Sequence, residues 1–275
     1  MLAALIIVFR EVIEAGMIVG IVAAVTKGVR GHGLWIAGGV LAGILGSCLV
    51  AAFVGVIAAS FSGAGNELFN AAILGLAVAM LGWHNIWMAQ HGRELANDLK
   101  QKGRAVASGR ATLWGLALVI AVAVLREGSE VVLFLFGVTV ADGGSPLALL
   151  VGGLGGLGLG VLVSLLTYAG LVKIPARYLF AVTSALIAFL AAGMAAQAVM
   201  FLEQGNFVSM LGGTIWNTSA ILSDRGIPGR VLHTLIGYSD QPSLLQLLAY
   251  LATLAVIFGA GRWLAPKQMP RPNAA

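Results

Sequence analysis

Seven long stretches of mostly apolar residues run along the chain, separated by shorter segments that collect the charged and turn-forming residues. About 20 consecutive apolar residues are enough for an α-helix to cross a bilayer. The pattern therefore predicts an all-α, polytopic membrane protein with seven transmembrane helices. We expect these helices at 2–25, 34–59, 67–90, 111–137, 147–171, 178–202 and 244–264.

Turn-forming residues support several of these boundaries. Ser145 and Pro146 are typical of an N-cap followed by the first helical position, so they predict the start of the fifth helix. Pro175 and Pro242 stand shortly before the sixth and seventh helices.

Composition agrees with a bilayer as the solvent. Only 10% of the 275 residues are charged, whereas a soluble domain has about 25%. The first apolar stretch contains Arg10, Glu11 and Glu14, which a cleavable signal peptide would not hold, so we expect a retained first helix. The single cysteine, Cys48, excludes an intramolecular disulfide.

Basic residues predict the orientation. Most of the 16 lysines and arginines follow the first, third, fifth and seventh apolar stretches, whereas the opposite loops hold only Arg225 and Arg230. Loops rich in Lys and Arg stay in the cytoplasm. We therefore expect a protein of the cell membrane with its N-terminus outside and its C-terminus in the cytoplasm. The net charge of +5 then needs no nucleic acid as a partner.

A short motif, R-E-x-x-E, occurs twice, at Arg10–Glu14 and at Arg126–Glu130. The copies lie three helices apart, so they must cross the membrane in opposite directions. We expect a single membrane domain, 1–275, in which 1–90 and 111–202 form an inverted repeat of three helices each. An outer loop, 203–243, and a seventh helix, 244–264, complete it. The second helix of each half is glycine-rich, which favours close helix packing.

Six ionisable groups in two apolar helices are costly, because each charged side chain at the bilayer centre costs roughly 2.5–3.5 kcal/mol on insertion scales. Helical spacing places the two carboxylates of each motif on one face, with an arginine able to pair along it. Inverted repeats place their substrate site at the interface between the halves. Four carboxylates and two guanidiniums leave two surplus negative charges, which predicts a cation site. Its expected ligands are Glu11, Glu14, Glu127 and Glu130, supported by Arg10 and Arg126.

Carboxylate oxygens favour hard cations, and Fe(III) suits the surplus negative charge. The residues alone leave Mn²⁺, Mg²⁺, Ca²⁺ and protons open. They also leave open two other interpretations: buried ion pairs that fix helix register, and a membrane-embedded redox enzyme. A di-iron enzyme would normally show Glu-x-x-His pairs, which both motifs lack.

At these motifs the chain resembles the oxidase-dependent iron permease family of fungal and bacterial iron uptake, whose mark is a pair of R-E-G-x-E motifs on the first and fourth helices. The second copy fits fully, whereas Val12 replaces the usual glycine in the first. Later stretches, such as Trp216–Ser219 and Gly237-Tyr238, also look like the family's. The resemblance implies seven helices and an outer N-terminus. It also implies that the four glutamates carry iron, expected as Fe(III), into the cytoplasm. Lead and manganese are alternative cargoes.

Four further residues are candidates for capture or exit of the ion. Glu67 and Glu203 stand at the expected outer ends of the third and sixth helices, where solvated acidic residues are also common. His84 and His91, near the expected cytoplasmic end of the third helix, suit Fe(II), but an interfacial aromatic belt with Trp83 and Trp87 is the favoured interpretation.

The expected protein is a permease and not an enzyme. No cofactor is expected, because iron is the transported substrate, and membrane lipid surrounds the chain. An extracytoplasmic ferroxidase or iron-binding protein is a candidate partner. The outer loop 203–243 would either dock such a partner or lie on the membrane.

Overall fold

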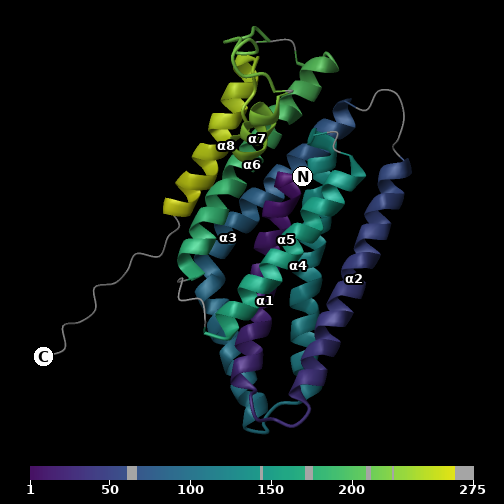
Figure 1. The fold of residues 1–275 in the computed structure, drawn as a ribbon, viewed down its shortest axis with the longest axis vertical. Helices are drawn as coiled ribbons and strands as arrows, with labels where there is room; N and C mark the ends of the chain where they lie inside the picture. Colours follow the sequence, from purple (N-terminus) through teal and green to yellow (C-terminus); the bar gives the residue numbers. More distant parts are fainter. Residues whose placement is uncertain (61–66, 143–144, 171–175, 209–211, 225, 264–275) are drawn as a thin grey trace, which may run out of the picture.

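A computed structural model describes residues 1–60, 67–142, 145–170, 176–208, 212–224 and 226–263. This part of the chain is all helical apart from one isolated β-bridge between Thr214 and Ser243, as the sequence predicts (Figure 1). Its helices are α1 (Leu2–Val25), α2 (His32–Ser60), α3 (Glu67–Ala107), α4 (Leu113–Asp142), α5 (Pro146–Tyr168), α6 (Ala176–Gln204), α7 (Ile227–Ile236) and α8 (Leu244–Trp263).

The long helices run along one axis and form a bundle with α1 and α4 near its centre (Figure 1). α2 packs mainly against α4, and α5 packs mainly against α1. α3 lies along α6, and α8 covers the other side of α6. The first motif helix, α1, is therefore covered by its neighbours, whereas α4 keeps exposed side chains such as Trp114, Leu118 and Val122.

Glycines allow the outer helices to approach the motif helices closely. A Cβ atom on Gly43 of α2 would lie 2.6 Å from the Cβ of Val124 in α4. A Cβ atom on Gly156 of α5 would lie 2.5 Å from the backbone oxygen of Leu5 in α1. Only a missing side chain permits such distances, so the glycine-rich faces serve the close packing that the sequence predicts.

An apolar core fills the space between α1, α3, α4 and α6, where Ile7, Leu74, Phe134 and Ile187 are fully buried. The outward faces of α2 and α5 expose many large apolar side chains instead, including Leu49 and Leu165. A surface of this kind suits the hydrocarbon of a bilayer and is unfavourable in water.

Four helices are long and apolar enough to cross a membrane by length and composition alone: His32–Ile57, Glu67–Met88, Pro146–Tyr168 and Ala181–Gln204. α1 and α4 each carry three ionisable residues from their motif, and the apolar part of α8 is shorter, Leu244–Ala260.

Several expected boundaries are confirmed. α1 and the starts of α3 and α8 fall where the sequence predicts them. The Ser145 side chain accepts a hydrogen bond from the Ala148 backbone at 3.2 Å, with Pro146 in the first turn, so the predicted N-cap of α5 is present. Pro175, Arg225 and residues 264–275 lie outside the described residues.

The structure adds two features beyond the expected spans. The third expected span, 67–90, agrees with the apolar segment Glu67–Met88, but α3 itself continues through a charged segment to Ala107. Lys and Glu are good helix formers, so a polar segment can extend a helix beyond the apolar stretch. The outer loop also contains a helix, α7, which ends at Gly237 in the left-handed conformation, φ 67°.

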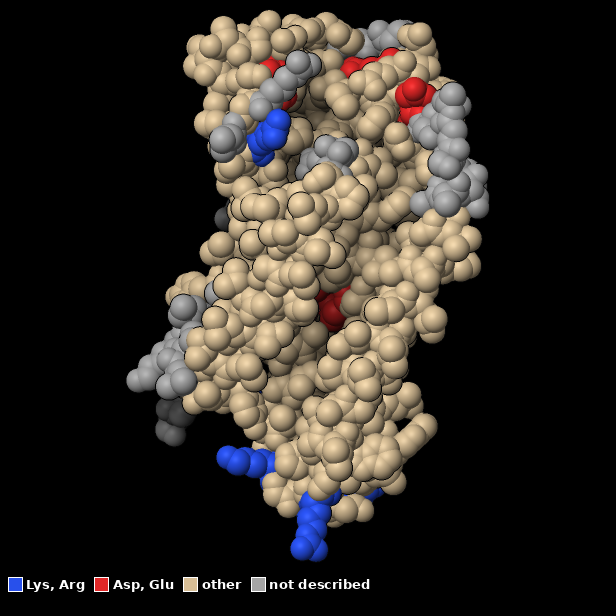
Figure 2. All heavy atoms as spheres, turned by 45° about the vertical axis from the view of Figure 1, so that its right-hand side comes forward, with Lys and Arg blue, Asp and Glu red and all other residues tan. Residues whose placement is uncertain are grey.

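Charge separates along the bundle axis. Lys27, Arg30, Arg104 and Arg110 are exposed where α1 meets α2 and α3 meets α4, and we call this the basic end. Glu67, Glu203, Asp224 and Asp240 lie at the opposite, acidic end. Figure 2 shows basic atoms at the lower end and acidic atoms at the upper end, where some basic atoms are also visible; further acidic atoms lie in a hollow at mid-height.

Candidate metal centre

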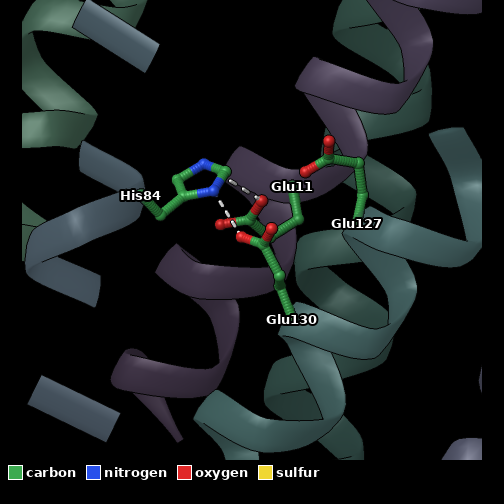
Figure 3. Close-up of side chains that lie close together, drawn as sticks. All are labelled: Glu11, His84, Glu127 and Glu130. Carbon is green, nitrogen blue, oxygen red and sulfur yellow. Dashed lines mark ion pairs between the residues drawn. The ribbon is translucent and has the colours of Figure 1, made fainter. Parts of the chain in front are cut away.

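The two motifs meet inside the bundle. Glu11 of α1, His84 of α3, and Glu127 and Glu130 of α4 each offer one ligand atom, and these atoms all lie within 4.8 Å of one another (Figure 3). Three helices therefore converge on one point with three carboxylates and one imidazole. We call these four residues the ligand cluster.

Glu127 is the carboxylate of the ligand cluster whose negative charge has the fewest compensating contacts. Its side chain is only 4% exposed. Among the described residues no cationic group lies within ion-pair distance of it, and its Oε2 atom has no hydrogen-bond donor. A buried carboxylate without a cationic partner is strongly unfavourable, so this position needs a proton or a cation.

The α1 half of the site holds its charges in close pairs. Nη1 of Arg10 lies 3.3 Å from Oε1 of Glu11, and Nε of Arg10 lies 3.0 Å from Oε1 of Glu14. All three side chains are buried. The predicted pairing along one helical face is confirmed here, and Glu14 stands beside the ligand cluster, in contact with Arg10 and His84.

The α4 half is more open. Nε of Arg126 lies 3.1 Å from Oε1 of Glu130, which is the predicted pair four residues apart. The guanidinium carbon of Arg126 also lies 4.5 Å from the ring centroid of Trp87 in α3, a cation–π contact. The Arg126 side chain is 40% exposed, so one side of the site can be reached from outside the bundle core.

A cavity of about 370 Å³ provides this access. It is lined by Met80, Trp83, His84, Trp87, Arg126 and Glu130, and so lies between α3 and α4. Two members of the ligand cluster, His84 and Glu130, form part of its wall. A cavity of this size can hold several water molecules, each of which occupies about 30 Å³ in the liquid.

His84 lies at the centre of the charged groups. Its Nδ1 atom is in ion-pair contact with Glu130, and its Nε2 atom lies 3.2 Å from Glu14 and 3.9 Å from Glu11. One imidazole thus contacts carboxylates of both motifs. From the sequence we expected His84 near the cytoplasmic end of the third span, because that span was expected to end at 90. The longer α3 leaves it well inside the helix and buried.

The other secondary candidates lie away from the ligand cluster. His91 stacks on Trp87, with ring centroids 5.1 Å apart, and its Nδ1 lies 3.2 Å from the Trp87 backbone oxygen. Glu67 begins α3 at the acidic end. Both carboxylate oxygens of Glu203 accept hydrogen bonds, from Ser243 at 2.6 Å and from Gln246 at 2.7 Å, which join the end of α6 to the start of α8.

The segment between α6 and α8 is held by its own polar contacts. The backbone nitrogens of Asp224 and Asp240 each donate to the other residue's carboxylate, at 3.3 and 3.2 Å. Burial raises the pKa of the Asp224 carboxyl above its ordinary value. These contacts join described parts of the segment to each other at the acidic end.

Comparison with known proteins gives a consistent result. The sequence pattern of the Iron permease FTR1 family matches residues 1–264. Proteins named "Ferrous iron permease EfeU" are similar over 89% of this chain. The one from Escherichia coli O157:H7 is 30% identical over 252 residues, 89% of its own length. The one from Yersinia pestis is 29% identical over 249 residues, 87% of its own length. No solved structure matches the chain.

Proposed function

The chain belongs to the Iron permease FTR1 family, and from this premise we propose that it carries iron into the cytoplasm through the buried carboxylates of its two R-E-x-x-E motifs. Iron transport across a membrane, by a multi-pass protein of apolar helices, is common to the family and its relatives. The route through this chain and the direction of transport are our proposal.

The convergence of Glu11, Glu127 and Glu130 carries the proposal. Three carboxylates from two helices approach one another in a region from which water is largely excluded. Their mutual repulsion is strong at low dielectric. A divalent cation removes it, and the buried oxygen of Glu127 without a donor is a position for such an ion. We propose these three glutamates as the ligands.

Glu14, the fourth expected ligand, has a different role in this proposal. Its Oε1 atom pairs with Arg10 at 3.0 Å and its Oε2 atom faces His84 at 3.2 Å. We propose that Glu14 and the two arginines hold the ligands in place and limit the surplus negative charge to an amount that one iron ion balances.

We also propose the inverted repeat of three plus three helices, with α8 as the seventh membrane helix. The reciprocal packing of α2 on α4 and of α5 on α1 supports it, because a two-fold relation between the halves would exchange these pairs. The basic end would face the cytoplasm by the positive-inside rule, which leaves the N-terminus outside. Under this orientation α7 and the segment around it lie outside, where a ferroxidase or iron-binding protein would deliver the ion.

We base a proposal for the oxidation state on the charge of the site and on the names of the relatives. The sequence favoured Fe(III), but four carboxylates and two guanidiniums balance a divalent ion fully. The relatives are named as ferrous iron permeases. We therefore propose Fe(II) as the ion that occupies the buried site, with Fe(III), manganese and lead as competitors to be tested.

Iron uptake by cells that lack their own high-affinity system tests the proposal. We expect Glu11→Gln and Glu127→Gln to abolish uptake while the protein still reaches the membrane. Glu94→Gln, a change at an exposed position on α3, is the matched control and should transport normally. Normal uptake by both motif variants would refute the proposed route.

A further inference from the structure

His84 lies outside both motifs, yet it is the residue that the two motifs share. Its ring is 3% exposed, and both ring nitrogens face carboxylates. An apolar or small polar residue on α3 would fill this space at a lower desolvation cost, since buried titratable groups are unfavourable without partners. We propose that His84 is a ligand of the transported ion and the residue that determines which metals the site accepts. This inference rests on the proposed function.

The donor set supports this assignment. Three carboxylates alone make an all-oxygen site, which suits Mg²⁺ and Ca²⁺ as well as iron. Imidazole nitrogen favours first-row transition metals such as iron and zinc over these ions. Replacing one oxygen donor by His84 therefore shifts the preference of the ligand cluster toward transition metals.

The two ring nitrogens have different surroundings, which suits one of them to bind a metal. Nδ1 faces Glu130, a member of the ligand cluster, whereas Nε2 lies 3.2 Å from Glu14, which is paired with Arg10. Metal-bound histidines commonly donate their other N–H to a carboxylate, which fixes the tautomer. Nε2–H donating to Glu14 would leave Nδ1 free to join Glu130, Glu11 and Glu127 around the ion.

The position of His84 also connects the site with its cavity. His84 and Glu130 are the two ligand-cluster residues in the wall of the 370 Å³ cavity. Glu11 and Glu127 line no part of it. An ion arriving through this cavity meets the His84 imidazole before it reaches Glu11 and Glu127. The imidazole would therefore discriminate between metal ions at an early step of binding.

Metal binding to the purified, detergent-solubilised full chain tests the inference. Affinities for Fe²⁺, Mn²⁺, Ca²⁺ and Zn²⁺ are measured anaerobically by isothermal titration for the unchanged protein, His84→Asn and His84→Cys. His91→Asn is the matched control, because it lies on the same helix but outside the ligand cluster.

We expect His84→Asn to lower the ratio of Fe²⁺ to Ca²⁺ affinity at least about tenfold, since losing even an outer-shell partner costs ten- to hundredfold in metal affinity. His84→Cys should instead increase the preference for a transition metal, here Zn²⁺ over Ca²⁺, because thiolate is softer than imidazole. A merely structural role for His84 would not produce opposite shifts in metal preference. His91→Asn should leave every ratio unchanged.

Two results separate this inference from the proposed function. If the unchanged protein binds iron and the His84 variants keep its metal ratios, the selectivity role is wrong and the glutamate site stands. If the unchanged protein binds none of the four metals, the proposed function fails with it. Should His84→Asn not fold, the direction of the change in His84→Cys still decides the question.

Discussion

Arg10 and Arg126 occupy equivalent positions in two copies of one motif, yet Arg10 is 1% exposed and Arg126 is 40% exposed. Arg10 pairs with both glutamates of its own helix. Arg126 pairs with Glu130 and lies over Trp87. The same residues thus form a closed, paired half on α1 and an accessible half on α4. A transport site benefits from this difference, because an ion needs a fixed set of ligands and also a way to reach them.

The third position of each motif shows how the two halves pack. Val12 of α1 faces Gly160 of α5, where a Cβ atom on the glycine would lie 2.8 Å from the Val12 Cβ. In the other half the glycine is on the motif helix: a Cβ atom on Gly128 would lie 2.1 Å from Oγ of Ser47 in α2. Each contact has one glycine, on opposite helices. The departure of Val12 from the family motif is therefore compensated by Gly160.

The first prediction distinguishes Glu127, a proposed metal ligand, from Glu14, a proposed supporting residue. Glu127→Gln should lower iron affinity about 100-fold or more, at the upper end of the losses seen on removing metal-site partners. It should leave folding intact, because the charge that it removes is buried and has no cationic partner among the described residues. Glu14→Gln should leave Arg10 with one fewer partner and lower thermal stability more than it lowers affinity. Isothermal titration with iron and thermal unfolding of both variants measure this, and the reverse ranking would contradict the assignment.

The second prediction compares the two arginines. Arg10→Gln should destabilise by about 3–5 kcal/mol, the usual cost of breaking a buried pair. Arg126→Gln should cost less, about 1 kcal/mol, since its partly exposed pair is worth little. Chemical unfolding in detergent, followed by intrinsic fluorescence, gives both values. Equal losses would show that the two halves are equally closed.

The third prediction exchanges the packing of the motifs. Gly128→Val should cost about 1–3 kcal/mol, because the new side chain overlaps Ser47. Adding Ser47→Gly reproduces the arrangement of Val12 and Gly160 and should recover most of that loss. A double-mutant cycle measures the coupling. Additive effects would mean that the two contacts are not equivalent.

The fourth prediction concerns the helix pairs themselves. Gly156→Ala should destabilise because the new methyl group would meet the Leu5 backbone. Gly158→Ala, on the same helix with open space around it, should be neutral or slightly stabilising, by up to about 1 kcal/mol for helix propensity. Thermal unfolding of the two variants should therefore differ in sign. A loss of similar size in both would indicate a general intolerance of α5.

Local sequence patterns determined much of this structure. The apolar stretches predicted the long helices, and the spacing of Arg126 and Glu130 predicted their ion pair. Spacing within one helix predicts which residues share a face, and this was sufficient to predict the ion pair.

The role of His84 depended on information that the sequence did not contain. A single histidine beside tryptophans looks like part of an interfacial belt, and only the meeting of α3 with α1 and α4 places it among carboxylates. The same meeting places Glu14 between Arg10 and His84, and for this reason we propose a supporting role for it. Contacts between distant helices decide such roles, and hydropathy does not report them.

A structure of the iron-loaded protein with anomalous scattering recorded at the iron edge tests the central claim most directly. We predict one strong peak enclosed by Glu11, His84, Glu127 and Glu130, on the side of the site that the α3–α4 cavity reaches. An iron peak at any other place in the bundle, with these four side chains unoccupied, would contradict the account.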